Sequence, residues 1–127
     1  MRKPTENMRL FKERRQKLAE LTAGSAVIVA SPEEKVRNGS VHFPFRQDSN
    51  LYYLTGFEEP ESVLVFRPGM SPETVMFVRK KNPERETWDG FRFGPEAVES
   101  QFQIDKCYPI EDFSTAIIDL LKGVEKI

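Results

Sequence analysis

The chain has 127 residues, a formal net charge of −1, 39% hydrophobic residues and 31% charged residues. This composition is typical of one soluble globular domain that can bury a core. The small net charge excludes a strong field for nucleic acid or membranes, and no apolar run approaches the roughly 20 residues of a membrane-spanning helix. The first residues lack the apolar stretch of a signal peptide and a single cysteine fits a reducing compartment, so we expect a cytoplasmic protein.

The first 40 residues predict a helix, a strand and a polar loop. A helix is expected over about 7–22, because apolar residues share one face and basic residues surround it; these are Phe11, Leu18 and Leu21 against Arg14, Arg15 and Lys17. The β-branched run 25–30 favours a buried central strand. Residues 31–40 are polar and contain the turn pair Asn38-Gly39. Residues 1–46 hold 10 Lys/Arg against 5 Asp/Glu, which we interpret as solvated surface rather than a ligand patch.

A dense aromatic block occupies residues 43–57 and places Arg46 and Asp48 among bulky apolar groups. Because charged side chains are rarely buried unpaired, the block indicates either a buried network or a recognition surface. We favour an internal Arg46–Asp48 salt bridge over a carboxylate-binding role for Arg46. Residues 48–50 can cap a short helix over 51–54 that ends at Gly56.

The second half predicts a hairpin followed by alternating helices and a strand. Residues 62–66 and 74–78 are expected to form antiparallel strands joined by a turn. Residues 80–94 are charged and interrupted by Pro and Gly, so we interpret them as a loop. A short helix over 95–102, a strand over 107–110 and a helix over 113–121 complete the pattern. The alternation predicts an α/β domain around a mixed sheet.

Few residues in the chain carry obvious chemistry. One histidine, His42, and one cysteine, Cys107, cannot build the usual transition-metal or nucleophilic sites. We expect Cys107 to be a small buried packing residue, and His42 to be a partly buried, hydrogen-bonded histidine rather than a ligand or an acid/base. The acidic runs 33–34 and 58–61 are interpreted as solvated turns rather than metal ligands. Trp88 is expected either to pack on the core or to be displayed at an interface. The chain by itself does not look like an enzyme.

Several segments, taken together, resemble one family. Residues 45–57, followed by 59–65, are similar to the N-terminal domain of Xaa-Pro aminopeptidase (aminopeptidase P), of the creatinase/prolidase N-domain type. Further agreement in order and spacing comes from residues 14–18, 24–27 and 86–94. Within the first segment, Asp48, Tyr53 and Gly56 match the family's structural signature.

The resemblance implies a fold, and it implies that catalysis belongs to a separate domain. It implies a mixed sheet flanked by helices, with ribonuclease-H-like topology, over residues 1–127. Family members carry a separate C-terminal "pita-bread" domain that holds two metal ions, usually manganese, and removes an N-terminal residue preceding proline. That domain is absent from this chain, so we expect no catalytic residue and no metal ligand here.

The resemblance also implies site residues and partners. Trp88 matches a family tryptophan at the substrate entrance, and Ser40, Arg46 and Arg92 are further candidates for the entrance or for inter-subunit contacts. Many members have an acidic residue where this chain has Ser40. The implied partners are the chain's own catalytic domain, other copies of the parent, and peptides with proline in second position. The alternatives are a peptide- or protein-binding module that has lost catalysis and, ranked lower, a nucleic-acid binder.

Overall fold

The computed structural model describes residues 8–22, 24–31, 36–37, 41–42, 47–89 and 91–124, apart from the side chains of 36, 37, 41, 42, 85, 88 and 89. In chain order the elements are α1 (Met8–Leu21), β1 (Val27–Ala30), β2 (Val36–Arg37), β3 (Val41–His42), α2 (Ser49–Thr55), β4 (Val63–Phe66), β5 (Thr74–Val78), α3 (Pro83–Asp89), α4 (Gly94–Gln101), β6 (Lys106–Pro109), the 3-10 turn η1 (Ile110–Asp112) and α5 (Phe113–Leu120). No helix in these ranges is long and apolar enough to cross a membrane.

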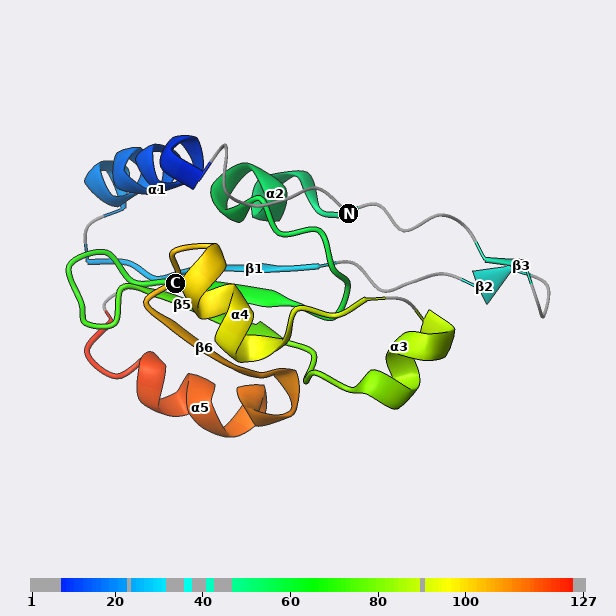
Figure 1. Cartoon of the computed structure of the whole chain (residues 1–127). Helices are drawn as coiled ribbons and strands as arrows, with labels where there is room; N and C mark the ends of the chain where they lie inside the picture. The colour runs from blue at the N-terminus through cyan, green and yellow to red at the C-terminus, as the bar shows by residue number, and fades with distance from the viewer. Residues whose placement is uncertain are drawn as a thin grey trace.

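A four-stranded mixed sheet in the order β1-β4-β5-β6 forms the middle layer (Figure 1). β1, β4 and β5 are antiparallel neighbours, with Val27 opposite Phe66 and Val63 opposite Phe77. β6 runs parallel to β5, which requires a crossover, and α4 supplies it. β2 and β3 form a separate two-stranded ribbon.

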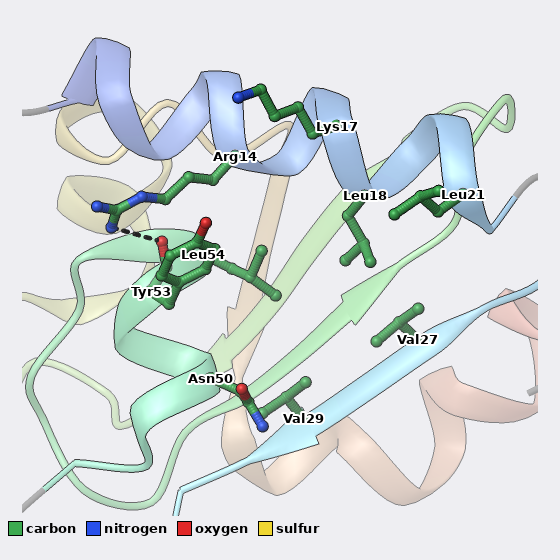
Figure 2. Close-up of a pocket in the computed structure, with 9 residues that line it drawn as sticks. All are labelled: Arg14, Lys17, Leu18, Leu21, Val27, Val29, Asn50, Tyr53 and Leu54. Carbon is green, nitrogen blue, oxygen red and sulfur yellow. Dashed lines mark hydrogen bonds between the residues drawn. The ribbon is translucent and has the colours of Figure 1, made fainter.

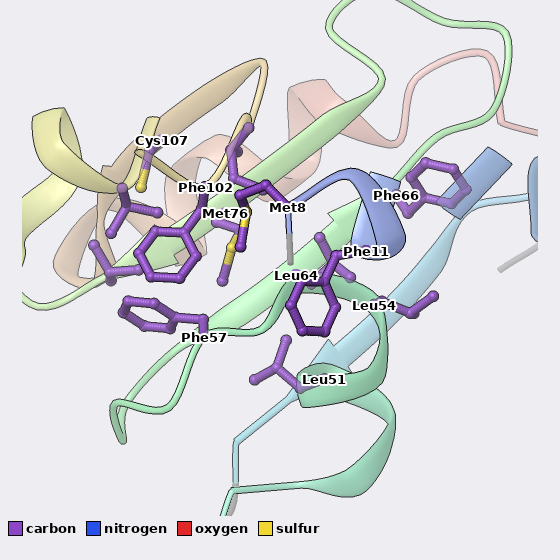
Figure 3. Close-up of a cluster of buried hydrophobic side chains, with 13 residues drawn as sticks. Met8, Phe11, Leu51, Leu54, Phe57, Leu64, Phe66, Met76, Phe102 and Cys107 are labelled. Atoms are coloured by element: carbon purple, nitrogen blue, oxygen red, sulfur yellow. The ribbon is translucent and has the colours of Figure 1, made fainter. Parts of the chain in front are cut away.

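The larger core fills the space between the sheet and α1, α2 and α4 (Figure 3). Alternate residues of each strand point to it: Leu64 and Phe66 from β4, and Met76 and Val78 from β5. The helices contribute buried residues that include Met8, Phe11, Leu51, Leu54 and Val98. On the opposite face of the sheet, a second core is formed by Leu120 of α5 with Val65, Val75 and Phe77 of the strands. The sheet is therefore covered on both faces.

Most of the expected elements are confirmed, including the first helix, the antiparallel hairpin and the last helix. Several expectations are wrong. The run 25–30 was expected to be a buried central strand, but β1 is an edge strand of the sheet and its residues are only partly buried or exposed. Leu21 is 84% exposed although it was placed on the buried face of the first helix, and Arg15 is buried although it was placed on the exposed one. The polar loop 31–40 contains β2, which pairs with β3.

The largest difference is α3, which lies in the stretch 80–94 that the sequence predicts as a loop. Pro83, counted as a helix breaker, is the first helical residue, where the missing N–H costs nothing. Glu84 and Glu86 then place negative charge in the first turn, which favours the helix dipole. Composition alone does not distinguish a proline at the first position of a helix from a proline that ends a helix.

The expected capping of α2 is confirmed at both ends. One carboxylate oxygen of Asp48 accepts the backbone N–H groups of Asn50 and Leu51, each at 3.0 Å. Gly56 closes the helix in a left-handed conformation, with φ of 77°, and its N–H donates to the Tyr52 carbonyl.

Replacing Gly56 with alanine is expected to destabilise the protein by more than about 1 kcal/mol, because an L-residue is strained at this φ. The added Cβ would also lie 2.5 Å from Cε2 of the buried Phe11 ring, so α1 would have to shift. Urea unfolding followed by circular dichroism measures the change. Gly69→Ala is the matched control, since its φ is 81° but no atom lies within 4 Å of the added Cβ. Equal losses for the two variants would show that the Phe11 contact is unimportant.

Candidate functional site

Residues 80–93 follow β5 and include Trp88, the residue that matches the family's tryptophan. We call this segment the α3 arm. Figure 1 shows α3 at one end of the molecule, the end at which the β2–β3 ribbon also lies. The arm returns to the body at α4, which begins at Gly94.

A carboxylate ties the two ends of the arm together. Oε1 of Glu86 accepts Lys81 Nζ at 2.7 Å and the backbone N–H of Arg92 at 2.8 Å. Lys81 Nζ also donates to the Arg92 carbonyl at 2.7 Å. The hydrogen bonds from Lys81 and from the Arg92 N–H hold the pKa of Glu86 below its usual value. This closed loop of contacts fixes where the helix sits relative to its two flanking segments.

Aromatic stacking joins the arm to the larger core. The Phe91 ring is 52% exposed, carries the Lys81 ammonium 4.1 Å from its centroid and meets Phe93 edge-on at 4.9 Å. Phe93 in turn packs edge-on against Phe102 at 5.1 Å and contacts Phe57 at 6.2 Å. The base of the arm is therefore continuous with the buried aromatic residues.

Glu59 is the residue that the sequence analysis misjudged at this site. It is 2% exposed, so the interpretation of run 58–61 as solvated is wrong here. Its Oε1 accepts Arg79 Nη2 at 3.2 Å and its Oε2 accepts the Phe93 N–H at 2.8 Å. Arg79 lies 20 residues away, so no local pattern reveals the pair. The one local signal is that Glu59 lies two residues after the apolar Phe57.

The structure describes only some of the candidate entrance residues. Ser40, Arg46 and the Trp88 side chain lie outside it, and so do the side chain of His42 and the proposed Arg46–Asp48 salt bridge. The backbone of Trp88 belongs to α3. Arg92 is partly buried and its Nη1 donates to the Lys80 carbonyl at 3.4 Å. Trp88 and Arg92 are thus both on the α3 arm, and their part in binding stays a prediction.

The three signature residues lie around α2, away from the arm. Asp48 and Gly56 cap that helix, whereas Tyr53 is 53% exposed on its surface. The guanidinium of Arg14 sits 4.2 Å from the Tyr53 ring centroid and donates to the Tyr53 carbonyl at 3.1 Å. These contacts attach α1 to α2, which supports a structural role.

A family model of the aminopeptidase P N-terminal domain matches residues 11–127. The chain belongs to this family. It is 38% identical to Xaa-Pro aminopeptidase of Haemophilus influenzae over 116 residues, which are 90% of this chain and 27% of that protein. It is 39% identical to Xaa-Pro aminopeptidase 3 of Dictyostelium discoideum over 117 residues, covering 90% of this chain and 23% of that one.

Solved aminopeptidase structures agree with the fold of this aminopeptidase P N-terminal domain. Pseudomonas aeruginosa aminopeptidase PepP superposes with a TM-score of 0.87 at 35% identity, covering 92% of this chain and 27% of that one. Escherichia coli aminopeptidase P with the inhibitor Pro-Leu gives a TM-score of 0.86 at 31% identity, and the match covers 95% of this chain and 28% of that one. The expected mixed sheet with flanking helices is confirmed. The chain spans about a quarter of the length of these relatives.

The described residues of this aminopeptidase P N-terminal domain contain no cluster of three or more His, Cys, Asp or Glu side chains that could hold a metal ion. A zinc-substituted form is known for aminopeptidase P of Escherichia coli.

The Cys107 thiol is expected to react very slowly with Ellman's reagent at pH 7.5. It is buried, and burial, followed by the nearby Glu99 carboxylate, raises its pKa to about 12. The stability linked to this shift is fully present below the unfolded thiol's pKa of 9.0 and is lost as the pH rises toward 12. Labelling with and without urea measures the difference. Rapid labelling of the folded protein would contradict the burial of this residue.

Proposed function

We propose that this chain is the non-catalytic N-terminal domain of a metal-dependent Xaa-Pro aminopeptidase. The parent protein would be a cytoplasmic enzyme that releases an N-terminal residue preceding proline, using two manganese ions in a separate catalytic domain. The observation that carries the proposal is the family match over residues 11–127 together with the relatives' names, both of which point to Xaa-Pro aminopeptidases about four times longer.

Within this proposal the α3 arm shapes the substrate entrance and contributes to oligomer contacts. Its support is the way that Glu86 and Glu59 anchor the arm while α3 lies at one end of the molecule. Trp88 would supply an aromatic surface for the flat proline ring and the charged amine of an Xaa-Pro peptide. Arg92, Ser40 and Arg46 are the other proposed contributors.

Peptidase activity on an Xaa-Pro peptide with added manganese tests the proposal. We compare this chain with the protein made from its full reading frame, and we expect hydrolysis by the full-length protein alone. Activity of the isolated chain would contradict a non-catalytic domain. If the full-length protein is folded and loaded with metal but shows no peptidase activity, the result would instead favour the peptide- or protein-binding module.

Replacing Trp88 with alanine in the full-length enzyme is expected to raise KM by roughly 5–30-fold with a smaller change in kcat, the equivalent of about 1–2 kcal/mol of lost aromatic contact. Trp88→Phe is the matched control and should recover most of the affinity, because it keeps an aromatic face. Initial-rate kinetics on a short Xaa-Pro peptide measure both constants. An unchanged KM for Trp88→Ala would remove this residue from the entrance.

A further inference from the structure

The helix α3 packs little against the rest of the domain. The side chains of Pro83, Glu84 and Thr87 are exposed, and no described helix or strand packs extensively on α3. Figure 1 shows α3 beyond the end of the sheet, apart from α4 and α5. A helix of 7 residues is marginal in water without packing. The position of α3 therefore depends on the side chains that link it to its flanking segments.

The helix α2 has the same length but is held by several contacts. Leu51 and Leu54 are buried in the larger core, and Arg14 of α1 donates to the Tyr53 carbonyl at 3.1 Å (Figure 2). Removing one of these contacts leaves the others in place. In α3, none of the side chains that the structure describes is buried. A single contact can therefore decide where α3 lies.

Glu86 supplies such a contact. Of the α3 side chains that the structure describes, it is the one whose hydrogen bonds reach both flanking segments. Its Oε1 accepts Lys81 Nζ from the segment before the helix at 2.7 Å and the Arg92 N–H from the segment after it at 2.8 Å. Both distances are typical of charge-assisted hydrogen bonds. Because Lys81 Nζ also donates to the Arg92 carbonyl, the three residues close a ring across the base of the helix.

The body of the domain holds the two ends of the arm without Glu86. The Phe93 N–H donates to the buried Glu59 carboxylate at 2.8 Å, and a Cβ on Gly94 would lie only 3.0 Å from the Cβ of Lys81. Lys81 and Gly94 thus lie against each other where the arm joins the domain. Loss of the Glu86 carboxylate should therefore release α3 and leave the sheet, both cores and the ends of the arm in place.

We propose that Glu86 is a positioning residue, whose carboxylate holds α3 in the orientation from which Trp88 contacts an Xaa-Pro peptide. Trp88 lies two residues after Glu86, and its backbone belongs to the same helix. The inference rests on the proposed function for the identity of the peptide. If α3 adopts the binding orientation in only a fraction of the molecules, the apparent affinity falls by that fraction. Glu59 then acts on the stability of the domain, and Glu86 acts on its affinity.

The mobility of α3 in the isolated chain is the first test, measured as backbone order parameters from ¹⁵N relaxation. We expect α3 values near about 0.85 in the unmodified chain and below about 0.6 in Glu86→Ala, whereas the values of β5 and the urea midpoint should not change. Alanine is at least as good a helix former as glutamate, so propensity does not explain a loss of order. Glu84→Ala is the matched control, because it also removes a first-turn carboxylate but an exposed one, and it should leave α3 rigid.

The substrate affinity of the full-length protein is the second test. Glu86→Ala is expected to raise KM for a short Xaa-Pro peptide by about 3–10-fold and to change kcat less than about twofold, because only about a tenth to a third of the molecules would then hold α3 in place. Glu86→Gln should recover part of the loss, since its amide oxygen can still accept the Arg92 N–H. In a Trp88→Ala background, Glu86→Ala should have no further effect, because both changes remove the same aromatic contact.

The other outcomes overturn the proposal. Unchanged α3 order parameters in Glu86→Ala, or an equal loss of order in Glu84→Ala, would show that the hydrogen bonds of Glu86 do not hold the helix. A mobile α3 with an unchanged KM, or a KM effect that adds to that of Trp88→Ala, would show that Glu86 does not position Trp88. If the full-length protein has no peptidase activity, the proposed function fails and the effect on affinity fails with it, whereas the relaxation data still decide whether Glu86 holds α3.

Discussion

Replacing Glu59 with alanine is expected to lower the free energy of unfolding by about 3–5 kcal/mol, the usual cost of removing one partner from a buried ion pair. The change leaves Arg79 and the Phe93 N–H without their carboxylate acceptor. The loss would leave the Arg79 guanidinium poorly hydrogen-bonded, because its buried Nε already lacks a hydrogen-bond partner in the described part of the chain. Urea unfolding of the isolated domain gives the value.

The neighbouring Glu58→Ala is the matched control, because Glu58 is exposed and should change stability by less than about 0.5 kcal/mol. Glu59→Gln separates charge from shape, since its amide oxygen can still accept the Phe93 N–H while the charge opposite Arg79 is lost. A double-mutant cycle with Arg79→Met isolates the coupling between the two side chains. If Glu59→Ala and Glu58→Ala were equally mild, the anchoring of the α3 arm by Glu59 would be refuted.

Replacing Arg15 with methionine is expected to cost about 2–4 kcal/mol, because two carbonyl groups lose charge-assisted hydrogen bonds. Arg15 Nη1 donates to the Leu54 carbonyl at 2.8 Å, and its Nη2 donates to the Gln103 carbonyl at 3.1 Å. Gln103 has a φ of 54°, a conformation that L-residues adopt at some cost, and Arg15 holds it there. Methionine keeps the length of the apolar stem, so the loss reports mainly on the guanidinium.

Arg9→Met on the same helix is the control, because the Arg9 side chain is 92% exposed and its ion pair with Glu13 is a surface one. Burial lowers the pKa of Arg15, and the charges of Asp105 and Glu73 oppose that shift. Thermal or urea unfolding of both variants measures the difference. A loss no larger than that of Arg9→Met would mean that Arg15 does not hold α1 to α2 and to the segment before β6.

Local sequence patterns were sufficient for most regular elements, though not for α3 or the β2–β3 ribbon, and for the caps of α2. The run 74–78 and its partner 62–66 are bounded by turn residues, so their pairing follows from their spacing. Asp48 and Gly56 act on backbone groups within a few positions of themselves, and interactions of that range are visible in a single sequence. The aromatic block and the other segments that agree with it in order and spacing together indicated the family, which the match over residues 11–127 confirms.

The tertiary structure alone decided which charged residues are buried and what they hold. Glu59 and Arg15 look like surface residues in their own segments, and their partners Arg79, Phe93 and Gln103 lie from 20 to 88 residues away. Leu21 is exposed for the converse reason, since nothing described packs over the end of α1. Sequence therefore determined most of the elements and the family, through patterns close along the chain, but not α3 or the β2–β3 ribbon. Burial and the anchoring of the α3 arm depend on contacts that exist only once the layers are packed together.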